Sequence, residues 1–389
     1  MNKEEKIAQI KQQVLEILSG VTPFNNPQTY HNSFIARRSI AGTNLPPYYL
    51  VYFLLGELLS FPNLGRDEKI AWSFPVTYKG REFFISHRKF GAGIFVLDEI
   101  KDEILASELL KLIIRSVSKA KDFFNLIAER AVKASELNVK NNSQELFARY
   151  EFLLELYEEQ HKYYLANKGK TKTEKGKTEY GSYISYVPLD RPFQIKANHL
   201  VISCTEAFFS WTEHLFIHLA IVANGFADGE KISKLIGAEW REKFQMAIIS
   251  EDKSVKKMYN ELLIVRQQLR NFVAHGAFGK DGRAFLFHSG AGAVPVVLDQ
   301  SHNRNRFSLT GSLVFDNEQI ITVLKDFVNF LWTSELQPAM CYIQKNGFPS
   351  ILTYAKNGLY ASVTEDMEKM QAFVEKMHYE FDNAGNMDW

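Results

Sequence analysis

The sequence predicts a mainly helical protein of the α+β class, with two domains and small antiparallel β elements. Long stretches carry apolar residues three or four positions apart, the spacing that gives a helix one buried face. Residues 70–98 instead have aromatic runs separated by glycine turns, which is typical of paired antiparallel strands. With 389 residues, 46% of them hydrophobic and 13% aromatic, the chain is long and apolar enough for two buried cores.

The first predicted domain, residues 1–185, combines helices with one small antiparallel β-meander. Apolar spacing predicts an amphipathic helix at the N-terminus, and a Pro-Pro pair should open a second, very apolar helix. We expect a sensory or regulatory role from this domain's size alone. Its expected elements are helices at 1–19 and 48–61, the meander at 70–98, and helices at 101–137 and 143–166.

The segment 167–182, NKGKTKTEKGKTEYGS, is predicted to be a basic, flexible linker at the end of this domain. It is almost free of apolar residues, so it cannot bury enough surface to offset the entropy lost on ordering. A mobile arm whose five lysines contact RNA phosphates is an alternative that stays open.

The second predicted domain, residues 186–389, is a helical bundle with a β-hairpin insertion. Its helices are expected from apolar periodicity and its hairpin from the glycine-rich sequence. The expected elements are helices at 198–224, 238–249 and 254–275, a hairpin region at 277–315, and helices at 317–335 and 364–382.

Composition excludes several classes of protein. The net charge is +1 with an isoelectric point near 7.7, so no global charge favours a nucleic-acid coat or a membrane surface. Two cysteines cannot form a disulfide framework or a four-cysteine metal site. The charged N-terminus does not resemble a signal peptide, and no apolar run is long enough to span a membrane. We therefore expect a cytoplasmic protein.

The stretch LRNFVAHGAFG, residues 269–279, ends the predicted helix 254–275 with side chains that a structural helix end does not require. At 100° per residue, the apolar residues of this helix fall within an arc of about 100° and form its core face. A second stripe lies roughly 110° from the core face and points outward. It consists of Ile264, Gln268, Asn271 and His275.

Arg270 and His275 are about 140° apart on a regular helix, so their side chains do not meet directly. A curled arginine, a distorted last turn or a second copy of the chain could bring both to one phosphate. The outward stripe favours the second copy, because a symmetric dimer brings two such stripes together. A histidine before a helix-ending glycine can instead have a purely structural role, as a C-terminal cap of the helix. This alternative stays open.

RNFVAHG, with Arg270, Asn271 and His275, resembles the R-x4-6-H motif of HEPN domains, including the polar residue that often follows the arginine. The resemblance covers residues 186–389 by architecture and seven residues by motif. It implies an all-α bundle that dimerises to form a composite site. HEPN domains that are paired with nucleotidyltransferase antitoxins carry a tyrosine two residues after the histidine, where this chain has Ala277, so a tyrosine-modification switch is not expected.

The resemblance implies a metal-independent endoribonuclease of a defence or toxin system, such as antiviral defence or abortive infection. His275 would transfer protons, Arg270 would stabilise charge on the phosphate, and Asn271 would orient one of them. RNA is then the substrate, a homodimer the active form and an antitoxin or activating protein a further partner, with no cofactor, metal or membrane. The alternative is a non-catalytic HEPN-like module that binds RNA, nucleotides or protein.

Helix 198–224 is apolar around most of its circumference and has one polar stripe that includes Glu213. A buried carboxylate needs a partner, and Arg266 and Arg270 are the obvious cations on the adjacent helix, so we expect an Arg–Glu pair that fixes the arginine head groups. In the site that the resemblance implies, Arg266 and Glu213 would bind the substrate or support the catalytic residues, with Glu213 holding Arg270 in place for the phosphate. His214 and His218, four residues apart, have a spacing that metals use, but packing is the simpler expectation because no third ligand is apparent.

Overall fold

The computed structural model describes residues 3–26, 28–275, 285–290, 292–296 and 317–387. The side chains of residues 268 and 270–275, and most of those of 285–296, lie outside the described part. The chain divides into two compact units, unit 1 (Met1–Ala134 with Phe373–Trp389) and unit 2 (Ser135–Ala372).

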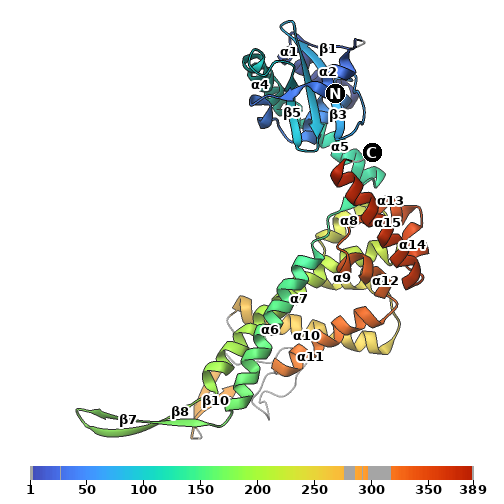
Figure 1. Cartoon of the computed structure of the whole chain (residues 1–389). Coiled ribbons are helices and arrows are strands. Elements are labelled where there is room, and N and C mark those ends of the chain that lie inside the picture. The colour runs from blue at the N-terminus through green and yellow to red at the C-terminus, as the bar shows by residue number, and fades with distance from the viewer. Residues whose placement is uncertain (1–2, 27, 276–284, 291, 297–316, 388–389) are drawn as a thin grey trace. The chain divides into compact units, whose positions relative to one another are not determined.

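Helices dominate both units, and the sheets are small and antiparallel, which confirms the mainly α, α+β class (Figure 1). Within the described ranges, no helix combines the length and the apolar composition that crossing a bilayer requires. The division into units differs from the predicted boundary at residue 185, because the chain passes from unit 1 to unit 2 after Ala134 and returns at Phe373.

Unit 1 is built on one five-stranded antiparallel sheet in the order β1-β3-β4-β5-β2. Its N-terminal segment contains α1 (Lys3–Ile17), β1 (Val21–Pro23), α2 (Thr29–Ile35), β2 (Arg37–Arg38), η1 (Ala41–Asn44), α3 (Tyr48–Tyr52), η2 (Phe53–Leu58), β3 (Ile70–Tyr78), β4 (Arg81–Arg88), β5 (Gly91–Val96), α4 (Glu103–Lys119) and α5 (Lys121–Ala134). Strands β3, β4 and β5 confirm the predicted meander. Alternate residues of these strands form a buried core with the helices, among them Phe74, Val76, Phe83, Ile85, Ile94 and Val96.

Two helices of unit 1 are divided where the sequence predicts continuity. The helix expected at 48–61 is a short α3 followed by the π-helical segment η2. The helix expected at 101–137 is divided at Ala120, where ψ is 8° and the backbone leaves the helical region. Neither break was predicted, because no proline or internal break in apolar spacing marks it.

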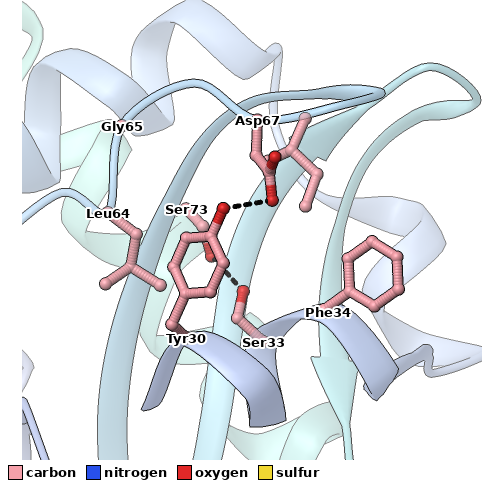
Figure 2. Close-up of a pocket in the computed structure, with 8 residues that line it drawn as sticks. Tyr30, Ser33, Phe34, Leu64, Gly65, Asp67 and Ser73 are labelled. Atoms are coloured by element: carbon pink, nitrogen blue, oxygen red, sulfur yellow. Dashed lines mark hydrogen bonds between the residues drawn. The ribbon is translucent and has the colours of Figure 1, made fainter. Parts of the chain in front are cut away.

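The opposite face of the sheet carries a chain of buried hydroxyl groups. Ser33 Oγ lies 3.1 Å from Ser73 Oγ, which lies 2.7 Å from Ser86 Oγ. Beside them the Tyr30 hydroxyl donates to Asp67 Oδ2 at 2.5 Å, and this bond holds the pKa of the Asp67 carboxyl below its ordinary value. Tyr30, Ser33, Ser73 and Asp67 line a small pocket (Figure 2). The hydroxyl groups satisfy one another inside the unit.

Unit 2 is a helical bundle around the long helices α6 and α7, which pack along each other (Figure 1). It contains β6 (Asn138–Val139), α6 (Ser143–Asn167), β7 (Thr171–Thr178), β8 (Gly181–Pro188), α7 (Arg191–Val222), α8 (Gly229–Ile236), α9 (Trp240–Ala247), α10 (Lys253–His275), β9 (Phe285–Ser289), β10 (Gly292–Val296), α11 (Asn317–Thr333), α12 (Gln337–Met340), η3 (Cys341–Lys345), β11 (Ser350–Ile351), α13 (Leu352–Lys356) and α14 (Leu359–Val363). Helix α15 (Met367–Asn386) crosses the division between the units.

Aromatic side chains fill the core of unit 2. Phe208, Phe216, Phe244 and Phe327 pack with ring centroids 5.4–6.1 Å apart, and Trp211 and Trp240 are fully buried beside them. Such rings remove large apolar areas from water and favour tilted contacts. This core holds helices α7, α9 and α11 together.

The segment predicted as a flexible linker forms part of a β-hairpin instead. Strands β7 and β8 pair antiparallel from Thr171↔Pro188 to Thr178↔Gly181, between the ends of α6 and α7 within unit 2 (Figure 1). The hairpin does not bury an apolar face, so composition alone did not predict it; the backbone hydrogen bonds of the ladder order it. In the predicted hairpin region 277–315, β9 and β10 pair antiparallel, and the rest of the region lies largely outside the described residues.

Candidate functional site on helix α10

Helix α10 has the orientation that its apolar spacing predicts. Val255, Leu262 and Val265 are buried in unit 2, at 7%, 0% and 1% exposure. Ile264, on the predicted outward stripe, is 40% exposed. The core face and the start of the outward stripe are therefore confirmed over the described part of the helix.

The backbone of α10 continues through Arg270 and Asn271 to His275. The side chains of these three residues lie outside the described part, as does all of Gly276. Residue 270 follows residue 266 by four positions, so on a regular helix it lies one turn further along nearly the same flank. On this flank of α10, the side chains that the structure describes are those of Arg266 and its neighbours.

Arg266 forms the predicted ion pair with Glu213 of helix α7. Arg266 Nη2 donates to Glu213 Oε1 at 2.9 Å, and the two side chains are 29% and 35% exposed. A charge-assisted hydrogen bond in this half-buried setting is stronger than a fully exposed ion pair, because water screens it less. Of the two arginines expected to pair with Glu213, Arg266 is confirmed and the Arg270 side chain lies outside the described residues.

Lys243 of helix α9 is a second cation on the same carboxylate. Its Nζ lies 3.5 Å from Glu213 Oε2, and its side chain is only 7% exposed. The sequence pattern did not single out this residue, although Trp240, Lys243, Phe244 and Ala247 are all buried at helical spacing and so place Lys243 on the apolar face of α9. The two oxygens of Glu213 therefore connect α7 with both α9 and α10.

Aromatic rings complete the surroundings of Arg266. Its guanidinium carbon lies 5.9 Å from the centroid of the Trp240 ring and 6.0 Å from that of Phe209, within the range of cation–π attraction. Glu239 Oε2 lies 3.9 Å from Arg266 Nη1. Contacts from α7 and α9 thus fix the position of the Arg266 head group.

His214 and His218 form a packed pair next to this cluster. Their Nε2 atoms are 3.1 Å apart, and His218 Nδ1 lies 2.7 Å from Ser350 Oγ. The backbone N–H of Asn142 donates to His214 Nε2 at 2.8 Å, so this nitrogen accepts. Burial lowers the pKa of His218 to about 3, and burial and the nearby Lys243 lower the pKa of His214. Both rings are neutral near pH 7 and link α7 to the start of α6 and to β11.

The comparisons with known proteins add no functional information. Neither a protein-family model nor a curated protein nor a solved structure matches the chain. The site must therefore be interpreted from its own residues.

Proposed function

We propose that this chain is a metal-independent endoribonuclease of a defence or toxin type, with Arg270, Asn271 and His275 of α10 as its catalytic residues. The observation that carries the proposal is the Glu213–Arg266 ion pair, because it anchors the flank of α10 one turn before Arg270 to the neighbouring helix α7. A preorganised arginine is what a site for a phosphate needs.

RNA supplies its own nucleophile, the 2′-hydroxyl, so the protein needs to provide only proton transfer and charge stabilisation. His275 takes the proton of the 2′-hydroxyl or gives a proton to the departing 5′-oxygen. Arg270 stabilises the negative charge that grows on the phosphorane, and Asn271 orients the phosphate or the imidazole by a hydrogen bond. The bond from phosphorus to the 5′-oxygen breaks, which leaves a 2′,3′-cyclic phosphate and a 5′-hydroxyl.

A homodimer completes this proposed site. Residues 270 and 275 diverge by about 140° on one helix, so an arginine from one copy and a histidine from the other meet most easily across a twofold axis. Ile264, exposed on the outward stripe of α10, supports an interface there. The same exposed residue also favours the second candidate, a non-catalytic module that binds RNA, nucleotides or protein through this stripe.

The test compares the wild type with His275→Ala on total RNA and on labelled oligonucleotides in excess EDTA. We expect the wild type to cleave and leave cyclic phosphate ends, and the variant to cleave at least about 100-fold more slowly, the usual contribution of a general acid or base. Equal cleavage by both proteins, or cleavage that EDTA abolishes, would contradict the proposal. Absence of cleavage at concentrations where a dimer forms would favour the binding module.

A further inference from the structure

The β7–β8 hairpin has two faces with different chemistry. Residues paired across an antiparallel ladder lie on the same face, and successive residues alternate between faces. One face therefore carries Lys172, Glu174, Gly176, Tyr183, Ser185 and Val187, and the other carries Thr173, Lys175, Lys177, Ser182, Ile184 and Tyr186.

The first face is satisfied by interactions within the hairpin. Lys172 Nζ lies 3.3 Å from Glu174 Oε1, so these two charges offset each other. The Tyr183 ring lies against the backbone of Gly176, since a Cβ at position 176 would come within 2.5 Å of three atoms of Tyr183. Lys172, Glu174 and the Tyr183 ring therefore have partners within the hairpin, although Tyr183 is 52% exposed.

The second face carries two lysines without a counterion. Among the described residues, no carboxylate lies within ion-pair distance of Lys175 or Lys177, and both are exposed. Ile184 and Tyr186 stand beside them at 57% and 67% exposure. Tyr186 pairs with Thr173, one position along this face from Lys175, so ring and ammonium are diagonal neighbours.

We infer that this second face of the hairpin binds single-stranded RNA. Lysines without counterions attract phosphates, and an exposed tyrosine beside them gives an unpaired base a surface on which to stack. A duplex keeps its bases stacked internally, so the aromatic ring favours a single strand. The choice of RNA as the ligand rests on the proposed nuclease function. The lysines without counterions and the exposed ring are observations that do not depend on that function. The hairpin then binds the RNA strand that the proposed catalytic residues of the same unit cleave.

The experiment measures the affinity of the full-length chain for a fluorescently labelled single-stranded RNA of 20 nucleotides by anisotropy, as a function of salt. All proteins carry His275→Ala, so that the probe stays intact. The test variants are Lys175→Gln/Lys177→Gln and Tyr186→Ser. The control is Lys168→Gln/Lys172→Gln, which removes the same charge from lysines that already have partners within the chain, since Lys168 lies over Tyr164 and Lys172 pairs with Glu174.

We expect the slope of log affinity against log salt to fall by about 1.4 in Lys175→Gln/Lys177→Gln, because each lysine that neutralises a phosphate of a single strand adds about 0.7 to the slope. Tyr186→Ser should weaken binding about 5- to 150-fold with little change in slope, the range expected when one base no longer stacks. The control should keep the slope of the parent protein. Equal effects in control and test variants, or none, would overturn the inference, as would tighter binding of duplex RNA or of single-stranded DNA.

Cleavage by the protein without His275→Ala, measured separately, distinguishes the two proposals. A changed slope without any cleavage supports the hairpin and refutes the nuclease. Cleavage that vanishes in His275→Ala, with an unchanged slope in the lysine variant, supports the nuclease and refutes the hairpin.

Discussion

Replacing Glu213 with glutamine removes the carboxylate that Arg266 and Lys243 share, at almost constant side-chain size. The Lys243 side chain is 7% exposed, and within the described part of the chain Glu213 is the only carboxylate at ion-pair distance from it. Removing one partner costs about 3–5 kcal/mol for a buried pair and less than about 1 kcal/mol for an exposed one. Since Glu213 is 35% exposed, we expect the free energy of unfolding of unit 2 to fall by about 2 kcal/mol.

Urea denaturation followed by tryptophan fluorescence measures this change, because the buried Trp211 and Trp240 report on unit 2. Lys243→Met completes a double-mutant cycle, in which we expect a coupling of about 1–2 kcal/mol with Glu213→Gln. Glu230→Gln, at an exposed carboxylate of α8, is the control and should change stability by less than about 0.5 kcal/mol. Additive effects in the cycle, or equal destabilisation by Glu213→Gln and Glu230→Gln, would refute the shared-carboxylate interpretation.

Three further predictions follow from the structure and the proposed function. Co-expressed Arg270→Ala and His275→Ala chains should regain RNA cleavage that each lacks alone, because one composite site of the mixed dimer keeps both residues; an inactive mixture would refute the composite site. The pKa of His218 is about 3 in the folded chain and about 6.5 in the unfolded chain. Its contribution to the free energy of unfolding is therefore complete above pH 6.5 and declines as the pH falls toward 3. The free energy of unfolding, measured by denaturation, should be about 2 kcal/mol higher at pH 8 than at pH 5 because of this group. His218→Gln should remove this part of the difference. Gly42→Ala would place a Cβ 2.5 Å from a backbone nitrogen of β5 and should destabilise unit 1 by about 1–3 kcal/mol in a thermal melt, whereas Gly385→Ala, with open space around it, should not.

Local apolar spacing predicted those parts of the fold that one helix face decides. Val255, Leu262 and Val265 face the core because they recur at helical intervals, and Ile264 falls outside that arc. The pairing of Arg266 with Glu213 could be expected as well, since a polar stripe on an otherwise buried helix needs partners. Each of these predictions depends only on the sequence of one segment or of two neighbouring helices.

Features that depend on distant pairing could not be predicted in the same way. The β7–β8 ladder orders a segment whose composition alone predicts disorder, and the exposed lysines on one face emerge only from the register. Lys243 was missed because a lysine on an apolar face is unusual, and its partner Glu213 lies thirty positions earlier on another helix. The division at Ala120 has no signal in the sequence because alanine is a good helix former.

Unit 1 is discontinuous in the chain, and this has a consequence for synthesis on the ribosome. The backbone N–H of Lys69 donates to the carbonyl of Met387, and Lys89 Nζ donates to Asn386, so the last turns of α15 belong to the same unit as the N-terminal sheet. About 240 residues of unit 2 emerge between these partners. At 5–20 residues per second, the nascent sheet waits about 12–50 s for its C-terminal segment, so unit 2 can fold before unit 1 is complete.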